Sequence, residues 1–545
     1  MLFHFWLTMR PAPDIWRWRL GMLMLVLLSL SACASLPSER ATPASAALAA
    51  SPNTALGALA LRAASRAAGA DSALASTRSG LRPMPDAHIA LDARITLIRR
   101  AQASLDVQYY QVGNDEIGRL FLRELRDAAQ RGVRVRLLID DFYTHGMDPL
   151  LLGLAAHSNV EVRLFNPFAS GRTGALGRLL NLAVDFKRLN HRMHNKMFVA
   201  DGAMAIVGGR NIADGYFFRG QDNFIDFDAF MIGPVVGQLE GIFDRYWNSQ
   251  HVYPIGTVAT SVDKPETLRA HFDRLVEGSR ATRRAAPVDS YGVPPMSLDM
   301  EEGLERLIWA ETEAFADDPN KVGRGTTDAE VEDSALYRAM RAFHESRSEL
   351  MLFSPYFVPG KEGMAGLKIA RDHKIPVRVI TNSMATTDEP LASLAYERYR
   401  LPMLKLGIEL YELRPLQAQD PRELPVGAGA SRARWHAKMA FIDRKTVVLG
   451  SLNLDRRSAI TNTELGLLIH SPVFAERTLQ YFRSRREADV RGAYKVILKP
   501  DGLGLQWVAL KGEGQSEVLE AEPDVDYLLR LQLLLLSPFV SEDLL

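Results

Sequence analysis

The chain carries one stretch of sequence twice, and this repeat constrains its fold more than any other feature. HNKMFVADGAMAIVGGRNIAD begins at residue 194, and HAKMAFIDRKTVVLGSLNLD begins at residue 436. Two copies that share the same downstream offsets indicate an internal duplication rather than a chance match. The shared positions are His194, Lys196, Asp201, Gly208, Gly209 and Asn211 in the first copy, and His436, Lys438, Asp443, Gly450, Ser451 and Asn453 in the second.

The duplication extends well beyond this motif. Each copy holds three apolar or alternating runs suited to buried strands, and a helical pattern separates the first run from the second (residues 116–132 and 362–374). Strand–helix–strand units of this length predict an α/β fold with two homologous domains, each a mixed β-sheet flanked by helices. The runs are SLDVQYYQV (104–112), GVRVRLLIDDF (132–142) and VEVRLFNPF (160–168), then ELMLFSPYFV (349–358), IPVRVITNSM (375–384) and IELYELRPL (408–416).

The first copy of the motif has the pattern of a β-hairpin closed by an Asp-Gly turn. His194 and Lys196 are two residues apart, so both point to one face of the strand, where they need either water or a shared anion. One such pair alone is more often a solvated strand edge than a site. In isolation, His191 and His194, three residues apart, would suggest a metal pair, but no cysteine and no helical His-Glu-X-X-His pattern stands nearby, so no metal site is predicted.

The paired His-X-Lys-X4-Asp motifs resemble those of the phospholipase D superfamily, over roughly residues 82 to 497. Within it the chain is most similar to the bacterial cardiolipin synthases, in particular to the lipoprotein-like type. This resemblance implies one active site shared at the interface of the two domains, with neither a metal nor another cofactor. The stretches that carry it are LNHRMHNKMFVADGAMAIVGGRNIADGYF, FDRYWNSQ and WHAKMAFIDRKTVVLGSLNLDRRSAITNTELGLLIHSP.

The motif residues suit chemistry on a phosphodiester, which is anionic and gathers further negative charge during displacement. Such a site needs fixed cationic donors, a nucleophile, and an acid for the leaving alcohol. The resemblance implies that His194 attacks phosphorus, although the near-symmetry of the two copies does not itself distinguish it from His436. His436 would protonate the leaving alcohol and then deprotonate the acceptor. The expected phosphate-binding residues are Lys196, Asn211, Lys438 and Asn453.

Each histidine also needs a partner that fixes its tautomer, preferably a carboxylate. Glu464 in the second copy and Asp226 in the first match the family positions, and Asp228 competes with Asp226 because both face the same way. Asp201 and Asp443 complete the catalytic motif, but their place at a turn favours a structural role. Three tyrosines would line the pocket or pack in the core, and two methionines are expected in the core. These are Tyr109, Tyr110 and Tyr356, and Met197 and Met439.

The N-terminus indicates export. Arg10, Arg17 and Arg19 precede the apolar run LGMLMLVLLSL, which is short for a membrane span and leads into LSAC. This pattern resembles a bacterial lipoprotein signal that is cleaved before a cysteine, here Cys33, the one cysteine of the chain. The alternatives are an uncleaved signal anchor or a true start at Met9. Ala34, rather than Asp, follows the cysteine and favours the outer membrane by analogy.

These features divide the chain into a signal peptide with a lipobox (1–33), an Ala/Ser/Pro-rich flexible tether (34–81) and a first phospholipase D-like domain (82–255). A loose linker (256–300), a second such domain (301–497) and a C-terminal extension (498–545) follow. The apolar run YLLRLQLLLLSPFV (527–540) predicts either a buried helix or one that dips into a bilayer surface.

The leading functional hypothesis is a membrane-associated phosphatidyltransferase that forms cardiolipin through a phosphohistidine. Its substrates would be phosphatidylglycerol, alone or with phosphatidylethanolamine, at a bacterial membrane surface, with the anchored enzyme facing the periplasm. The alternatives are a hydrolytic phospholipase D or nuclease with the same site, and a catalytically silent lipid-binding protein. Lys plus Arg and Asp plus Glu both total 65, so the chain lacks the basic excess typical of nucleic-acid binders, and nucleic acid is not an expected partner.

Overall fold

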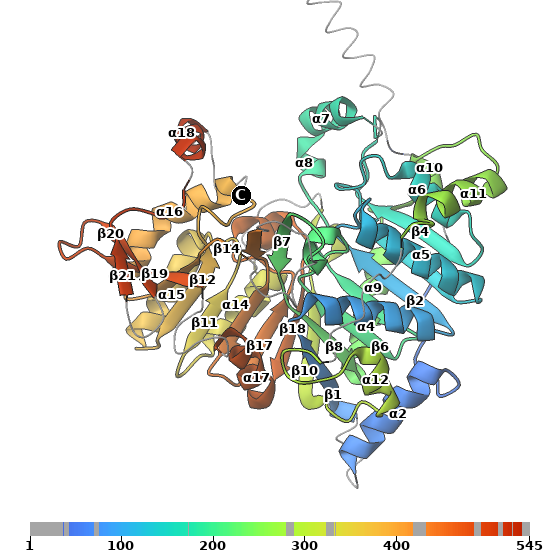
Figure 1. Cartoon of the computed structure of the whole chain (residues 1–545), viewed down its shortest axis with the longest axis horizontal. Helices are drawn as coiled ribbons and strands as arrows, with labels where there is room; N and C mark the ends of the chain where they lie inside the picture. Colours follow the sequence, from blue (N-terminus) through green and yellow to red (C-terminus); the bar gives the residue numbers. More distant parts are fainter. Residues whose placement is uncertain are drawn as a thin grey trace, which may run out of the picture.

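The two copies form two halves that stand side by side and share one continuous 18-stranded sheet (Figure 1). The structure is a computed structural model, and it describes residues 36, 43–69, 76–169, 171, 172, 174–279, 288–322, 332, 334–417, 432–483, 492–510, 516–525 and 527–536. The pairings give the strand order β9-β4-β3-β2-β5-β6-β8-β1 in the first half and β10-β18-β17-β16-β11-β12-β13-β19-β20-β21 in the second.

Corresponding strands of the two copies occupy corresponding places. In each half three parallel strands are followed by three antiparallel ones, which makes the sheet mixed. The six are β4 (Val160–Phe165), β3 (Arg134–Asp140), β2 (Ser104–Tyr109), β5 (Met197–Ala200), β6 (Met204–Gly208) and β8 (Asp228–Ile232), matched by β13 (Glu409–Leu413), β12 (Val377–Asn382), β11 (Leu350–Phe353), β16 (Lys438–Ile442), β17 (Thr446–Gly450) and β18 (Leu465–His470). The predicted duplicated α/β fold is confirmed.

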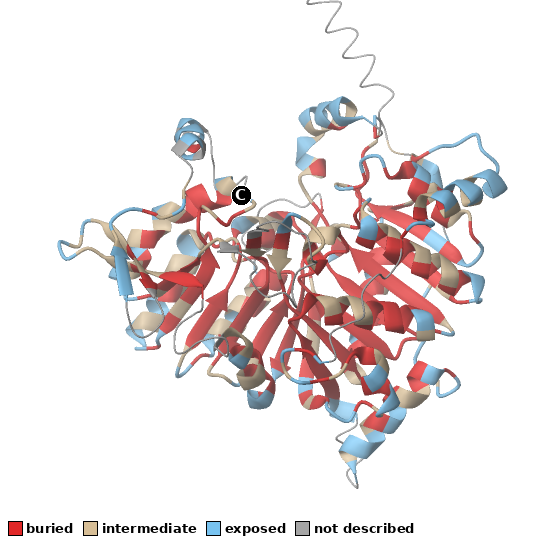
Figure 2. Cartoon of the chain, viewed as in Figure 1, coloured by how far each residue is buried: buried red, intermediate tan, exposed pale blue. Residues whose placement is uncertain are grey.

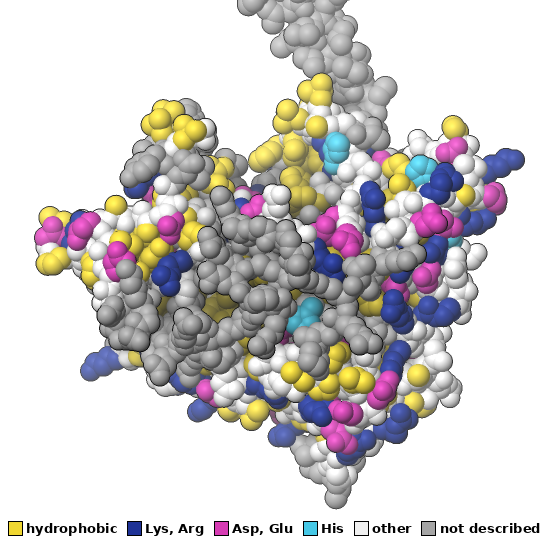
Figure 3. All heavy atoms as spheres, viewed as in Figure 1, with side chains coloured by type: hydrophobic (Ala, Val, Ile, Leu, Met, Phe, Trp, Pro, Cys, Tyr) yellow, Lys and Arg dark blue, Asp and Glu magenta, His cyan; other side chains and the backbone are white. Residues whose placement is uncertain are grey.

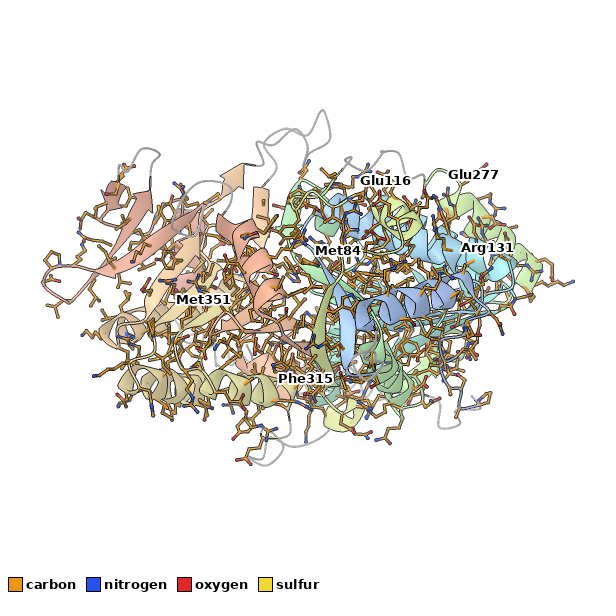
Figure 4. The ribbon with its side chains drawn as sticks, turned by 90° about the horizontal axis from the view of Figure 1, so that it is seen from below. Met84, Glu116, Arg131, Glu277, Phe315 and Met351 are labelled. Atoms are coloured by element: carbon orange, nitrogen blue, oxygen red, sulfur yellow. The ribbon has the colours of Figure 1, made fainter. Side chains whose placement is uncertain are left out.

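The halves join through β1 (Arg78–Met84) and β10 (Ile308–Ala316), which pair antiparallel with each other. Met84 and Phe315, from these two strands, lie near the middle of the molecule in Figure 4. A small second sheet also crosses the boundary, because β7 (Asp222–Ile225) of the first half pairs with β15 (Arg432–Trp435) of the second. The remaining strands are β9 (Val252–Pro254), β14 (Leu416–Gln417), β19 (Ala493–Leu498), β20 (Leu505–Leu510) and β21 (Ser516–Leu519).

Buried side chains form a core under the helices of each half and a third core that contains residues of both (Figure 2). Met197 and Met439 belong to this shared core, as the sequence predicts. The next residue of each strand, Phe198 or Ala440, packs into the core of its own half. The strands that follow the two motifs therefore contribute alternate residues to opposite cores, and this ties the halves together.

The first motif forms the predicted hairpin, in which β5 pairs with β6 across Asp201 and Gly202. Both turn residues have positive φ angles, 52° and 62°, as a tight hairpin turn requires.

The helices are α2 (Ala55–Ala68), α4 (Ala87–Arg100), α5 (Glu116–Gln130), α6 (Asp148–Ala155), α7 (Ala175–Val184), α8 (Phe186–Leu189), α9 (Pro234–Trp247), α10 (Ile255–Val258), α11 (Pro265–Val276), α12 (Met296–Glu301), α14 (Ala335–His344), α15 (Gly360–Asp372), α16 (Pro390–Lys405), α17 (Pro472–Arg483) and α18 (Tyr527–Leu536), with short helical turns η1 (Asp214–Phe217), η2 (Pro319–Lys321) and η3 (Arg457–Thr461).

The prediction of a flexible tether over residues 34–81 is wrong for its described part. Helix α2 packs on the first half, where Leu56, Ala60 and Ala63 join its core. The Thr54 side chain caps this helix by accepting a hydrogen bond from the Gly57 amide at 3.1 Å. Alanine is common in linkers and is also the best helix former, so composition alone concealed the helix.

The loose linker predicted over residues 256–300 is also wrong where it is described. Helix α11 packs against α6 and places Phe272 and Val276, one helical turn apart, in the core of the first half. Further along, Asp289 and Asp299 both form buried ion pairs with Arg82, each with an N···O distance of 2.9 Å. Both stretches are thus bound to the first half.

The C-terminal extension continues the sheet, because β19 spans the predicted boundary at residue 497 and pairs with β20. The predicted apolar helix, α18, packs on α16, but its description as a buried helix is wrong. Leu533 is buried, whereas Leu528, Leu531 and Leu535 are exposed. The signal peptide and Cys33 lie outside the described residues. Among the described residues, no helix is both long and apolar enough to cross a membrane.

Candidate active site

The two motifs lie at the carboxyl ends of the parallel strands. β5 runs antiparallel to β2 with Met197 opposite Gln108, so His194 and Lys196, just ahead of β5, lie beside the end of β2. In the second half β16 runs antiparallel to β11 with Met439 opposite Phe353, which places His436 and Lys438 beside the end of β11. The carboxyl edge of a parallel sheet is the usual place for a site in an α/β fold.

The backbone connects each histidine to the other half. The His194 amide donates to the Thr463 carbonyl at 2.9 Å, and the His436 amide donates to the Ile225 carbonyl at 2.8 Å. Thr463 and Ile225 immediately precede the two candidate carboxylates. The segment around each motif histidine therefore runs beside the segment that carries the carboxylate of the opposite half.

The carboxylates pair crosswise with the histidines. His194 Nδ1 lies 2.9 Å from Glu464 Oε2, and His436 Nδ1 lies 2.6 Å from Asp226 Oδ2. A carboxylate at Nδ1 holds the proton there and leaves the lone pair of Nε2 for chemistry. Each histidine thus depends on the opposite half for its orientation, which neither copy of the motif reveals alone.

Asp228, the competing carboxylate, lies elsewhere. Its Oδ2 atom is 3.0 Å from Arg94 Nη2 and 3.2 Å from Arg210 Nη1, and all three side chains are buried. This arrangement commits Asp228 to a buried ion-pair network next to the site, whereas Asp226 contacts the histidine.

The two carboxylates differ in their surroundings. Glu464 accepts hydrogen bonds from the hydroxyl groups of Ser451 and Ser458, the second at 2.7 Å. Asp226 accepts a hydrogen bond from the Phe227 amide at 2.7 Å, and the position equivalent to Ser451 in this half is Gly209. A Cβ atom at Gly209 would lie 2.1 Å from Asp226 Oδ1, so this position has no room for a side chain. The near-symmetric halves therefore hold their carboxylates by different means.

The two motif lysines are buried, and each donates to the carbonyl of the histidine in its own motif. The distances from Nζ to the carbonyl oxygen are 2.7 Å for Lys196 and 2.6 Å for Lys438. Burial, reinforced by the charge of Lys438, lowers the pKa of Lys196 well below its ordinary value. Burial lowers the pKa of Lys438 to about 8. An anion bound beside these lysines would oppose both shifts and favour their charged forms.

Burial also lowers the pKa of both histidines, that of His194 to about 4. The Glu464 carboxylate opposes this effect at His194, as Asp226 does at His436. Although burial raises it, the hydrogen bond from His436 and the charge of Lys438 hold the pKa of Asp226 down to about 2. Before substrate binds, the histidines are therefore neutral and both orienting carboxylates are ionised near pH 7.

The two asparagines have different contacts. Asn211 Oδ1 accepts from the Gln111 amide at 3.2 Å, and its Nδ2 donates to the Tyr216 hydroxyl at 2.9 Å. Asn453 Oδ1 is buried and has no hydrogen-bond partner among the described residues. Asn211 is thus built into the wall beside the site, whereas Asn453 has an unused acceptor.

Aromatic rings flank both histidines edge-on or tilted. The Tyr110 ring lies 5.0 Å from that of His194, and the rings of Tyr216 and Phe224 lie 5.1 and 5.2 Å from that of His436. Tyr110 thus lines the site. The Tyr356 ring lies 5.9 Å from Lys438 Nζ, so it also borders the site, and its hydroxyl donates to Asp388 Oδ2 at 2.7 Å. Tyr109 belongs to the core of the first half.

The sequence reasoning missed Tyr216 and Ser458. Each stands five residues after the motif asparagine of its copy, and each contacts that asparagine or the carboxylate beside it. Extending the alignment of the two copies past Asn211 and Asn453 would have revealed the shared position, although the residue types differ.

The two motif aspartates, Asp201 and Asp443, are part of the sequence motif, but they lie away from the active site. Asp201 accepts hydrogen bonds from the amides of residues 102–104, and Asp443 accepts from those of residues 347–349. These contacts fix the starts of β2 and β11, at the opposite ends of β5 and β16 from the histidines.

In the part of the chain that the structure describes, the histidine pair His191 and His194 does not form a metal site. His191 Nδ1 lies 2.8 Å from the Thr461 carbonyl. Among the described residues no group of three or more His, Cys, Asp or Glu side chains is arranged to hold a metal.

Comparison with known proteins agrees with this arrangement. A family model described as "Cardiolipin synthase, PLD-like domain" matches residues 95–247 and 340–486, one region in each half. The chain is 39% identical to cardiolipin synthase C of Escherichia coli over 73% of this chain and 82% of that one. It is 23% identical to a cardiolipin synthase of Staphylococcus aureus over 76% and 68% of the two chains.

A solved structure has the same fold. The phosphatidylserine synthase of Haemophilus influenzae is 14% identical to this chain and covers 89% of it, with 99% of its own chain matched and a TM-score of 0.52. The family match in two regions and the identity to cardiolipin synthase C over most of both chains establish the family of this sequence. The chain belongs to the cardiolipin synthase family of phospholipase D-like proteins.

Proposed function

We propose that this protein is a phosphatidyltransferase that makes cardiolipin from phospholipids through a phosphohistidine intermediate. The observation that carries the proposal is the pair of histidines, each oriented by a carboxylate of the opposite half, with two buried lysines beside them. The names of the relatives support the same reaction class.

The reaction would proceed in two displacements. His194 Nε2 attacks the phosphorus of a donor phospholipid, and the headgroup alcohol leaves with a proton from His436 Nε2. The N–P bond formed on His194 replaces the P–O bond that breaks. His436, now neutral, takes the proton from a lipid hydroxyl as its oxygen attacks phosphorus, which releases cardiolipin and restores His194.

The charges of the site fit these two reaction steps. A neutral His194 is the form that can attack, and its pKa of about 4 keeps it neutral at physiological pH. His436 must be protonated in the first step, although burial and Lys438 lower its pKa in the free enzyme. The negative charge of a bound phosphodiester raises the pKa of His436 towards the value that a general acid needs. Lys196 and Lys438 would hold the equatorial phosphoryl oxygens, with Asn453 and Asn211 at their sides.

Hydrolysis is the competing outcome, because water can replace the lipid alcohol in the second step. Product analysis separates the two. Purified full-length protein would be incubated with vesicles of phosphatidylglycerol, alone or with phosphatidylethanolamine, and the lipids identified by mass spectrometry. We expect cardiolipin as the main product, with EDTA causing no loss of rate since the side chains supply the cations. Phosphatidic acid as the dominant product in every mixture would contradict the transferase and leave a hydrolytic phospholipase D.

The value of kcat/KM is expected to fall first as free His436, the acid of the first step, loses its proton, and to show a second alkaline limb near pH 8. The charged form of Lys438 binds phosphate, and burial lowers the pKa of this lysine to about 8, so the free enzyme loses the cation above that pH. The measurement is kcat/KM between pH 6 and 10 at constant ionic strength. Lys438→Arg, whose charge persists at every pH of the series, is expected to be slower but to lack the second limb. A wild-type profile that does not steepen near pH 8 would show that Lys438 does not bind substrate as a titrating cation.

The protein would work at the bacterial cell envelope, anchored to a membrane and facing the periplasm, with Cys33 carrying the lipid. Cys33→Ser is expected to block lipid attachment and leave an uncleaved or soluble form, because the thiol is the group that is modified. Fractionation with intact-mass measurement tests this expectation. Recovery of the variant in membranes at the normal mature mass would contradict the lipoprotein assignment.

A further inference from the structure

Two helices stand over the edge of the sheet that holds the active site, one from each half. At the end of β3, Arg178 of α7 donates to the carbonyls of Asp141 and Phe142 at 2.9 and 2.8 Å. Near the end of β12, Leu533 of α18 packs with Met384. Strands β3 and β12 are equivalent in the two copies, and each is the neighbour of the strand, β2 or β11, at whose carboxyl end a motif histidine lies. Helices α7 and α18 therefore project from the same edge as the site (Figure 1).

Both helices expose large apolar side chains instead of burying them. Among the side chains whose burial is described, Arg178 anchors α7 and Leu533 anchors α18, while Leu176 on α7 is 70% exposed and Leu535 on α18 is 69% exposed. Figure 3 shows hydrophobic side chains gathered on both projections. The exposed apolar residues are Leu176, Leu179, Leu180, Val184 and Phe186 on α7 and α8, and Leu528, Leu531 and Leu535 on α18. Clusters of this kind on a folded protein mark a surface that meets a partner or a membrane.

The charges beside these clusters select a lipid surface. Lys187, next to Phe186, and Arg530, next to Leu531, are both exposed. Asp185, on the other side of Phe186, is paired with Arg188 at 2.6 Å. Exposed apolar side chains flanked by a cation are suited to the boundary between acyl chains and anionic headgroups, where the apolar part enters and the charge stays at the phosphates. The two clusters come from different halves and stand over the edge that holds both motif histidines, so a flat surface can meet both at once.

We propose that α7 and α18 insert their apolar side chains into the bilayer surface and hold the edge of the sheet with His194 and His436 against the headgroups. This inference rests on the proposed function in one respect, that the substrate is a membrane phospholipid. A donor lipid then keeps its acyl chains near the bilayer while its phosphate reaches the histidines. The same contact places lipid hydroxyls, rather than bulk water, next to the intermediate.

The test compares the full-length protein with two double variants and a matched control. The variants are Leu176→Ser with Leu179→Ser on α7, and Leu528→Ser with Leu531→Ser on α18. The control is Leu298→Ser with Val473→Ser, which removes two exposed apolar side chains from α12 and α17 at the opposite edge of the molecule (Figure 1). Rates are measured on phosphatidylglycerol–phosphatidylethanolamine vesicles and on short-chain phosphatidylglycerol dispersed as monomers.

Each helix variant is expected to lose roughly tenfold or more of the rate on vesicles and to keep its rate on monomeric lipid within about twofold. The control should match the wild type on both substrates. Unchanged rates on vesicles would overturn the proposal. So would an equal loss on monomers, which would locate the effect in the site or the fold. A change in self-association without a change on vesicles would assign the surface to a second copy of the chain.

Insertion is also measured without turnover. Leu180→Trp and Leu531→Trp are each expected to add fluorescence that lipids with brominated acyl chains quench, whereas Val473→Trp should add fluorescence that they do not. Quenching without cardiolipin formation would sustain this inference and overturn the proposed function. Cardiolipin formation without quenching at either position would do the reverse.

Discussion

Replacing either motif histidine with alanine, His194→Ala or His436→Ala, is expected to lower kcat by roughly four orders of magnitude or more. One variant lacks the nucleophile and the other lacks the group that serves as acid and then as base. Since both act in one site, the double variant should be scarcely slower than either single variant. Turnover of a defined phospholipid, followed by mass spectrometry, gives the rates.

The chain offers a matched control in His191, three residues before the nucleophile. Its Nδ1 atom contacts the Thr461 carbonyl and not the reacting groups. His191→Ala is therefore expected to retain most of the activity, and all the variants should melt cooperatively. Substantial turnover by either motif variant, with a wild-type melting temperature, would refute a single shared site.

The second large effect concerns the carboxylates that orient the histidines across the interface. Asp226→Asn and Glu464→Gln are each expected to lower kcat by roughly 10² to 10⁴-fold, since an amide allows the wrong imidazole tautomer and no longer stabilises the imidazolium. The cost should fall on kcat more than on KM, because neither carboxylate touches the substrate. Steady-state kinetics on monomeric short-chain lipid measures both parameters.

The crosswise pairing makes this prediction specific. Asp226 lies in the first half but contacts His436 of the second, at 2.6 Å. Imidazole ¹⁵N resonances in Asp226→Asn should therefore shift at His436 and remain unchanged at His194. Asp228→Asn is the control: it breaks a buried ion pair with Arg94, so it should lower the free energy of unfolding by about 3–5 kcal/mol. A shift confined to His194 in Asp226→Asn would contradict the pairing.

The sequence predicted the parts of this protein that repeat. Three strands of each half, and the hairpin of the first motif, follow the periodicity of the apolar runs, because buried strands need such runs wherever they lie in the chain. The offsets that relate His194 to Asn211 recur at His436 and Asn453, and the structure brings both motif histidines to the carboxyl edge of the parallel strands. Local pattern and duplication together were sufficient for this level of description.

Other features depend on contacts that no local pattern encodes. The pairing of Asp226 with His436 follows from the parallel alignment of β7 with β15, strands that lie in different halves. The helix α2 resembled a linker in composition because three of its four buried residues are Gly57, Ala60 and Ala63, which are small. The sequence of helix α18 favoured a buried helix because nearly every residue is apolar, yet Leu533 is buried whereas Leu528, Leu531 and Leu535 are exposed. Tertiary context decided each of these cases.

The covalent intermediate provides the most direct test of the central claim, that the two halves form one site in which His194 receives the phosphatidyl group. Wild-type protein would be quenched by denaturation under turnover with phosphatidylglycerol labelled in its phosphate, digested at neutral to alkaline pH, and mapped by mass spectrometry. We expect the label on the peptide that contains His194, and no label in His194→Ala. Label on the peptide that contains His436, or no label while cardiolipin is forming, would contradict it.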